Sequence, residues 1–295
     1  MRNAAHDAVH DDEELNMIVV TGATGNIGRP LTQALFKAGE QVTAVSRHAA
    51  AVPEGVRHVT ADLAEPAGLA PALDGAKSLF LLLSGDLHAP EARPGDIIDL
   101  AAAQGVGKVV LLSSQGVATR PHGTTRIAMR ALEDKLRASG LDWAVLRPGG
   151  FASNALAWAE SIRTEGTVAA PFGDTGVPVV DPLDIAEVAA ACLLENRHAG
   201  AVHTLTGPEV ITPREQAETI AAALGTPVRF HELTRAEAKA GMVRAVPAEL
   251  ADDTLDIISA PTQEELSISP DVERVLGRAP HSFGDWVARN IAAFR

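Results

Sequence analysis

Short apolar runs alternate with amphipathic stretches along the first half of the chain. The runs are rich in β-branched residues or leucine and are too short for helices, so each predicts a strand buried in a sheet. They lie at 17–20, 41–47, 56–63, 77–84, 108–114 and 143–146. The intervening stretches at 95–104 and 124–139 have the apolar spacing of helices. This alternation predicts an α/β fold built on a Rossmann-type, doubly wound parallel sheet.

The pattern loosens after residue 150, where predicted helices alternate with shorter predicted strands. The helices are expected near 155–163, 182–195, 213–224 and 283–294. The strands are expected near 177–180, 202–206 and 228–232. We therefore expect residues 151–295 to form a smaller α/β lobe, interleaved with a first domain over residues 17–150.

Composition and charge narrow the class of protein. Of the 295 residues, 46% are hydrophobic, and the formal net charge of −13 argues against nucleic acid or an anionic membrane as partner. Residues 1–16 are acidic and lack apolar periodicity, so they predict a disordered tail. No apolar run resembles a membrane span or a signal peptide, which favours a cytoplasmic protein. The single cysteine, Cys192, excludes an internal disulfide and is expected to be a buried, inert thiol.

The first predicted strand is followed at once by a glycine-spaced turn, Thr21-Gly22-Ala23-Thr24-Gly25-Asn26-Ile27-Gly28, and then by a predicted helix. The first glycine permits the tight turn, the second lets the backbone approach a pyrophosphate, and the third lets the helix pack close to its strand. The phosphate charge is then held by free N–H groups at the positive end of the helix. This context predicts dinucleotide binding by residues 17–150. The candidate contacts in the turn are Gly22, Thr24, Gly25, Asn26, Ile27 and Gly28.

The residue that reads the ribose is expected at the end of the second strand. An acidic residue there would bind the ribose hydroxyls of NAD, but this chain has Ser46, Arg47 and His48. A guanidinium group suits a 2′-phosphate, so Arg47 favours NADP(H) as the cofactor. The alternative is that Arg47 is a solvated surface charge.

Other loops at the carboxyl ends of the predicted strands complete the nucleotide site. Asp62 and Leu63 are placed to flank an adenine ring, although Asp62 is equally suited to cap a helix. Ser84 is expected beneath the ribose or the nicotinamide, in the loop that begins at Leu83. Pro148 begins the corresponding loop after the sixth strand.

These motifs together resemble NmrA-like proteins. The resemblance is carried by the glycine turn, Arg47, Ser113-Ser114 and the segment 136–149, and it extends over nearly everything after residue 16. NmrA-like proteins are atypical short-chain dehydrogenases/reductases that bind NAD(P). Members include NADPH-dependent quinone and dye reductases, reductases of plant phenolic pathways, and redox-sensing regulators without turnover. A homodimer is a further expectation that the resemblance brings.

The chain departs from the classical short-chain dehydrogenases in their catalytic pair. Classical members place a tyrosine, and four residues later a lysine, on the helix after the fifth strand, where the lysine lowers the pKa of the tyrosine. This sequence contains no tyrosine. By register, Thr125 and Met129 hold the two positions. A phenolate-driven mechanism is therefore excluded.

The remaining candidates for catalysis lie near the end of the fifth strand. Hydride transfer to a quinone needs mainly alignment, and the stable reduced anion can take its proton from water or a weak donor. His122 is the candidate donor, because imidazole exchanges protons near neutral pH; a solvated loop histidine is the alternative. Ser113 and Ser114 are candidates to hydrogen-bond a substrate carbonyl, or else to cap the strand end.

Three residues after the sixth strand are candidates to line the substrate pocket: Phe151, Asn154 and Trp158. Core packing is the alternative for the two aromatic residues, and helix capping for Asn154. Asp86, His88 and Glu91 have no standard metal-site spacing and predict a solvated loop, so no metal is expected.

Three functions remain open from the sequence. The leading hypothesis is an NADPH-dependent oxidoreductase that transfers hydride to a quinone or polycyclic aromatic small molecule. The first alternative is a nucleotide-binding redox regulator without turnover, which the loss of the tyrosine and lysine favours. The second is a tailoring enzyme that uses the nucleotide structurally while it promotes a coupling or rearrangement. Hydride consumption distinguishes the first function from the other two.

Overall fold

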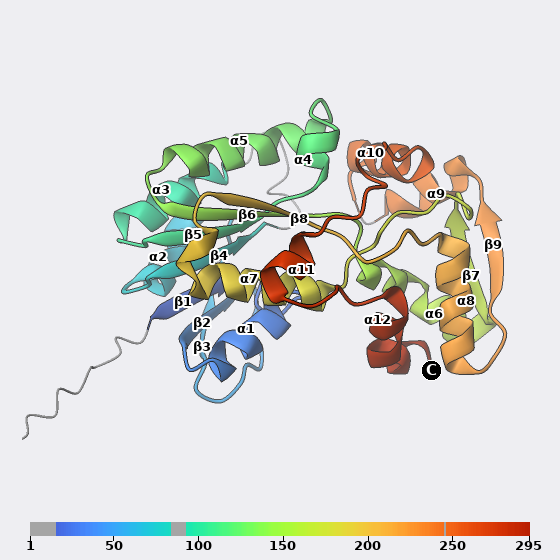
Figure 1. The fold of residues 1–295 in the computed structure, drawn as a ribbon, viewed down its shortest axis with the longest axis horizontal. Coiled ribbons are helices and arrows are strands. Elements are labelled where there is room, and N and C mark those ends of the chain that lie inside the picture. The colour runs from blue at the N-terminus through green and yellow to red at the C-terminus, as the bar shows by residue number, and fades with distance from the viewer. Residues whose placement is uncertain (1–15, 84–92, 245) are drawn as a thin grey trace, which may run out of the picture.

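Seven strands form the main sheet of the computed structural model, which describes residues 16–83, 93–244 and 246–295. The strands are β1 (Met17–Thr21), β2 (Gln41–Ser46), β3 (Arg57–Thr60), β4 (Ser78–Leu82), β5 (Lys108–Leu112), β6 (Asp142–Pro148) and β8 (Ala201–Leu205). All neighbours are parallel, in the order β3-β2-β1-β4-β5-β6-β8 (Figure 1). The strand order reverses between β1 and β4, so the predicted doubly wound, Rossmann-type sheet is confirmed.

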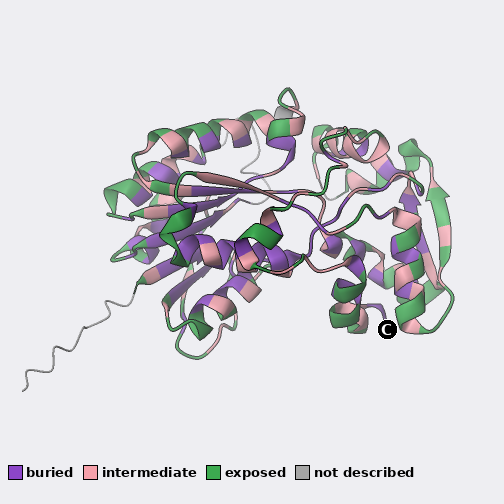
Figure 2. Ribbon diagram, in the orientation of Figure 1, coloured by how far each residue is buried: buried purple, intermediate pink, exposed green. Residues whose placement is uncertain are grey.

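Helices cover both faces of this sheet (Figure 1). One face carries α1 (Gly28–Lys37), α7 (Pro182–Leu194) and α11 (Asp271–Leu276). The other carries η1 (Pro66–Leu69), α2 (Ala70–Leu73), α3 (Gly95–Ala103), α4 (Gly116–Thr119) and α5 (Thr124–Ala138). Val20 and Phe80 pack against the first helix layer, and their strand neighbours Val19 and Leu79 pack against the second. The central strands are therefore buried on both sides, as their unbroken apolar runs predict (Figure 2).

A smaller group of elements lies beyond β6 and has its own core. Its two-stranded parallel sheet pairs β7 (Thr167–Pro171) with β9 (Arg229–Leu233). The helices around it are η3 (Ala152–Trp158), α6 (Ala159–Glu165), α8 (Pro213–Leu224), α9 (Arg235–Met242), α10 (Ala248–Ser259), α12 (Phe283–Asn290) and η5 (Ile291–Phe294). Trp286 stacks on Phe283 at 5.5 Å between ring centroids and meets Phe294 edge-on at 6.2 Å. All three rings belong to α12 and η5, and they are buried in this core together with residues of α6 and α8.

The structure corrects one predicted strand and adds another. The expected strand at 177–180 is wrong, because these residues make only isolated bridges: Val177 to Ile211, and Val180 to Phe151. Pro178 has no N–H to donate and interrupts any continuous ladder there. β7 was not predicted, since its alternation of exposed and buried positions extends over only five residues.

Three later elements return to the main sheet. α7 and α11 pack on the face that α1 covers, and β8 pairs with β6 at the sheet edge. η4 (Asn196–His198) connects α7 to β8. No helix within the described ranges is long and apolar enough to cross a membrane.

Candidate functional site

A groove of about 360 Å³ opens at the carboxyl ends of β1, β2 and β4. It is lined by Thr21, Gly22, Thr24, Gly25, Asn26, Val45, Ser46, Arg47, Ala61, Asp62, Leu63, Ala64 and Leu82. The groove thus joins the glycine turn, Arg47 and the Asp62-Leu63 pair, which sequence reasoning placed together. It lies where the strand order reverses, the position at which open α/β sheets bind ligands.

The glycine turn needs its glycines for three different reasons. Gly22 has a φ of 62°, which side chains rarely tolerate. A Cβ on Gly25 would lie 3.3 Å from the Gly22 carbonyl oxygen, whereas one on Gly28 would lie 2.2 Å from the same atom. Gly28 therefore allows α1 to press against the turn, and Gly25 keeps the floor of the groove free of side chains.

The N-terminus of α1 faces this turn and has no side-chain cap within the described part of the chain. By contrast, Asp181 caps α7, and Thr212 and Glu215 form a capping box on α8. The first N–H groups of a helix carry partial positive charge and need acceptors. α1 is therefore the helix end at this site that is suited to hold a phosphate.

The adenosine end of the groove contains Arg47 and Asp62. Arg47 is exposed at the end of β2, and none of residues 46–48 is acidic. Ser46 donates to the His48 carbonyl oxygen at 2.7 Å. Asp62 accepts from the Ala64 N–H at 2.9 Å. Asp62 thus makes the local backbone contact expected of a cap while it also lines the groove.

The turn is tied to the segment after β6. The Asn26 Nδ2 donates to the Ser153 Oγ at 2.7 Å, which places η3 beside the phosphate end of the groove. Pro148 ends β6, and its carbonyl oxygen accepts from the Gln115 N–H at 2.9 Å. The strand ends of β5 and β6 are thereby held together next to the turn.

A buried carboxylate organises these two strand ends. Glu133 of α5 is 0% exposed. It accepts from the Ser113 Oγ at 2.5 Å, from the Arg147 Nε at 3.0 Å and from the Arg137 Nη2 at 2.8 Å. Burial opposes its ionisation, but the hydrogen bonds from Arg147, Ser113 and Arg137 prevail and lower the pKa of Glu133. The Ser113 hydroxyl is therefore engaged with Glu133.

This network was missed by sequence reasoning. Its signal was present in the helix spacing, because Glu133 stands on the same stripe of α5 as the buried Met129, Leu132 and Leu136. A charged residue on an apolar stripe is rarely buried unless it is paired.

The other catalytic candidates have different settings. The Ser114 Oγ accepts from the Gly116 N–H at 3.2 Å. This is the kind of contact expected if Ser114 caps the end of β5. His122 is exposed between α4 and α5. Arg126 was not predicted as a site residue, yet its side chain lies near the end of β5. A Cβ on Gly116, which begins α4 just after β5, would lie 2.6 Å from the Arg126 Nε. Burial lowers the pKa of Arg126, and Asp253 and Glu265 counteract this effect.

None of the remaining predicted residues that the structure describes lines the groove. Ile27 and Leu83 are buried in the core. Phe151 is half-buried, Trp158 packs against the smaller core and Asn154 is exposed. Ser84 lies outside the described residues, and so do Asp86, His88 and Glu91. The side chain of Thr125 is likewise outside them.

A second ion pair joins the β5 end to the C-terminal part of the chain. Arg120 donates to both carboxylate oxygens of Glu265, at 2.8 Å each, and Thr119 donates to Glu265 Oε1 at 2.8 Å. Burial opposes the ionisation of Glu265, but these bonds lower its pKa. The segment after α10 is thereby fixed beside α4.

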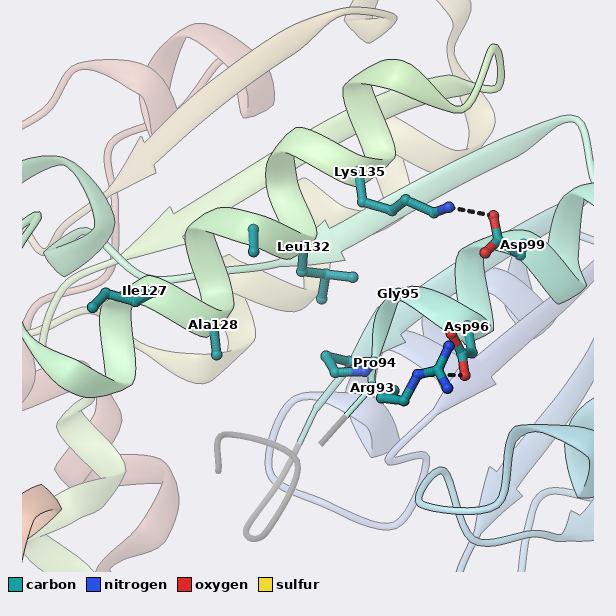
Figure 3. A pocket seen from close by; sticks show the side chains of 10 residues that line it. Arg93, Pro94, Gly95, Asp96, Asp99, Ile127, Ala128, Leu132 and Lys135 are labelled. Carbon is teal, nitrogen blue, oxygen red and sulfur yellow. Dashed lines mark ion pairs between the residues drawn. The ribbon is translucent and has the colours of Figure 1, made fainter. Parts of the chain in front are cut away.

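A larger hollow of about 550 Å³ lies between α3 and α5 (Figure 3). It is bordered by the ion pairs Lys135–Asp99, at 2.6 Å, and Arg93–Asp96, at 3.3 Å. None of the residues that line it belongs to the glycine turn or to the groove. The predicted nucleotide-binding residues therefore belong to the smaller groove and not to this hollow.

Comparisons with known proteins agree with this geometry. A family model described as NAD(P)H-binding matches residues 22–196. The chain is 36% identical over 288 residues to (4-alkanoyl-5-oxo-2,5-dihydrofuran-3-yl)methyl phosphate reductase of Streptomyces griseus, over 94% of this chain and 99% of that protein. It is 31% identical over 286 residues to NAD(P)H azoreductase of Xenophilus azovorans, over 94% and 99%. The structure of the NADPH-dependent quinone oxidoreductase QOR2 of Escherichia coli with NADPH matches with a TM-score of 0.75 at 26% identity, over 94% of this chain and 99% of that chain.

Proposed function

Because the chain belongs to this NAD(P)H-binding family, as an NmrA-like oxidoreductase, we propose that it transfers hydride from NADPH to a quinone or polycyclic aromatic molecule. The QOR2 structure, solved with NADPH, and the azoreductase support an acceptor of this general kind. In this proposal residues 17–150 bind the nucleotide, and the smaller lobe within 151–295 contributes the substrate side.

The choice of NADPH rests on charge at the groove. Arg47 lines the adenosine end, where a 2′-phosphate would meet its guanidinium group. The uncapped end of α1 suits the pyrophosphate. Asp62 binds its own loop through the Ala64 N–H, which leaves Arg47 to select the phosphate.

The kind of acceptor rests on one observation, the absence of the tyrosine that donates the proton in classical members. The chain has no tyrosine, and Met129, at the position expected for the lysine, is 6% exposed in the core. The acceptor must then become a stable anion when hydride arrives. A quinone would meet this condition, because bound NADPH would supply a hydride, which is two electrons and one proton, and the resulting hydroquinone monoanion would take its second proton from solvent.

Residues at the β5 and β6 ends are then assigned by position. Arg126 places positive charge near the β5 end, where it would stabilise the reduced anion. Phe151 and Trp158 are proposed to contact the ring, with Asn154 at the entrance. Ser114 is proposed as the hydroxyl that approaches the substrate carbonyl, since Ser113 is engaged with Glu133. His122, exposed on the neighbouring loop, is proposed to relay the proton from water.

A second substrate class is favoured by the S. griseus relative, which shares 36% identity along nearly its whole length. The dihydrofuran ring in its name has a double bond conjugated with two carbonyl groups. Hydride addition to that bond gives an enolate spread over both carbonyls, which again needs no strong acid. A conjugated lactone is therefore the other acceptor that fits a site without tyrosine.

The test begins with binding and continues with label transfer. We expect calorimetry under one condition to give tighter binding of NADPH than of NADH. With a quinone, NADPH oxidation should accompany hydroquinone formation and should slow when the transferable C4 hydrogen is deuterium, because a label carried to oxygen exchanges with water. With a conjugated lactone, the deuterium should remain on a ring carbon of the product. Nucleotide binding without NADPH oxidation by any of these acceptors would contradict the proposal and leave the regulator without turnover and the tailoring enzyme.

A further inference from the structure

Three metal-ligating side chains meet at the far end of α7 from the groove. Cys192 lies near the C-terminus of α7, His198 on η4 and His203 on β8. Each offers one ligand atom, and the three atoms lie within 4.8 Å of one another. Lys108, the first residue of β5, also reaches this cluster through its contact with Leu193. The cluster therefore lies toward the amino ends of the strands, whereas the groove lies at their carboxyl ends.

His198 is buried and His203 is half-buried, and each ring leaves one buried nitrogen unsatisfied. His198 is 4% exposed and Cys192 is 1% exposed. The Nε2 atoms of His198 and His203 are both buried and have no hydrogen-bond partner within the described residues. The rings meet edge-on, with centroids 5.1 Å apart, and this contact gives neither nitrogen a partner. Buried ring nitrogens are rarely left in this state, so they point to an absent ligand.

We propose that Cys192, His198 and His203 form a binding site for one zinc ion. A thiolate with two imidazoles is a donor set that suits zinc, whereas magnesium and calcium prefer oxygen ligands. In tetrahedral zinc sites the ligand atoms are roughly 3.3–3.6 Å apart, so no pair in the cluster would have to close by more than about 1.5 Å. The Cys192 thiol loses its proton to solvent when the metal binds.

Glu195 is the candidate fourth ligand. Its Oε2 lies 3.8 Å from the His198 Nε2, close to the spacing of two ligands on one metal. The same carboxylate is paired with Arg197, which is more than half exposed and can release it to the ion. Binding through Glu195 would close the site, and a closed site is typical of structural rather than catalytic zinc.

The loop that carries these ligands is already fixed by its neighbours. Lys108 Nζ donates to the Leu193 carbonyl oxygen at 3.1 Å and to the Asn196 Oδ1 at 3.0 Å. Arg197 Nη2 donates to the Val275 carbonyl oxygen at 3.2 Å, which anchors the loop to α11. Supports of this kind orient ligands before the metal arrives and keep the required contraction small. The ion would then fasten the edge strand β8 to the end of α7.

The test uses the full chain without a histidine tag, freed of metal by a chelator. We expect one Zn²⁺ to bind per chain in competition with a chromophoric chelator, at micromolar or lower concentration, and Mg²⁺ not to bind. Cys192→Ala and His203→Gln should each weaken zinc binding at least about ten-fold. The matched control is His231→Gln, because His231 is an exposed histidine on β9 and should leave binding unchanged.

A spectroscopic measurement on the unaltered protein guards against variants that fail to fold. Co²⁺ in place of zinc should give a thiolate-to-metal charge-transfer band, which reports Cys192 because the chain has no other cysteine. Absence of that band, zinc binding below one ion per chain, or equal binding by Cys192→Ala would overturn the site. NADPH binding should be the same with and without zinc, so this result is independent of the proposed reaction.

Discussion

At the residue scale, Arg47 is the side chain that most directly decides which nucleotide is bound. It is exposed at the adenosine end of the groove, where it lines the wall together with Asp62. Arg47→Ala should weaken NADPH binding by about 1.5–3 kcal/mol, the usual value of a hydrogen bond to a charged group. This corresponds to about ten- to 150-fold in Kd by calorimetry. NADH has no 2′-phosphate, so its Kd should hardly change.

The control for this change is Arg57→Ala. Arg57 is a cation on the neighbouring strand β3 that donates to the Pro71 carbonyl oxygen at 3.0 Å and does not line the groove. The Arg57→Ala substitution removes the same charge as Arg47→Ala but lies outside the nucleotide site, so NADPH and NADH should both bind as before. If Arg47→Ala weakened NADPH and NADH equally, Arg47 would not be the group that recognises the phosphate.

At the element scale, Glu133 connects α5 to the ends of β5 and β6. Its folded-state pKa is lowered, although burial opposes this, because Arg147, Ser113 and Arg137 all donate to the carboxylate. The unfolded chain therefore binds a proton more readily than the folded protein. The stabilisation is fully present above the ordinary glutamate pKa of about 4.3 and is lost as the pH falls through the lower folded value.

Glu133→Gln tests this linkage. At neutral pH the variant should lose about 3–5 kcal/mol of unfolding free energy, because two arginines lose a buried partner. In urea unfolding at a series of pH values, the difference from the unaltered protein should shrink below about pH 4.3. Glu218→Gln, at an exposed position on α8, is the matched control and should show no such difference. A difference that stayed constant with pH would mean that the charge of Glu133 does not stabilise the fold.

The contrast between the glycine turn and Glu133 shows what the sequence could predict. The turn is a local feature, because strand, glycines and helix follow one another within residues 17–37, and their roles depend on nearby backbone. The Glu133 network joins three elements, and only the fold brings Ser113 and Arg147 to it. From sequence alone, Glu133 and Arg137 form an ordinary surface pair one helical turn apart.

The same distinction separates the strands. The six strands of the first half were predicted from runs that are apolar or rich in β-branched residues, although the third and fourth runs were drawn longer than β3 and β4. The smaller lobe was predicted less well. Val177 and Val180 are β-branched, like the residues of a typical strand. However, Val177 forms a bridge with Ile211, whereas Val180, on the other side of Pro178, forms one with Phe151. Local propensity cannot reveal which partner a short segment will find.

At the scale of the whole molecule, the pair Arg120–Glu265 joins the main sheet to the C-terminal part of the chain. Arg120 follows α4, and Glu265 lies in the segment after α10, with side chains 24% and 6% exposed. Arg120 Nη2 also donates to the Ala260 carbonyl oxygen at 2.7 Å, so two points of that segment are held. Removing either partner leaves the other charge poorly solvated, which costs more than the net value of the pair.

A double-mutant cycle of Arg120→Ala and Glu265→Ala measures this coupling. Each single change should lower the unfolding free energy by about 2–3 kcal/mol, and the double variant should lose less than the sum by at least about 1 kcal/mol.

The Arg120–Glu265 pair lies beside the β5 end and not in the groove, so NADPH should bind both single variants with its usual Kd. Acceptor reduction should suffer instead, as a lower kcat/KM, because the segment that covers the β5 end is released. Additive losses of stability, or a weakened Kd for NADPH with an unchanged kcat/KM for the acceptor, would show that this pair does not position the substrate side.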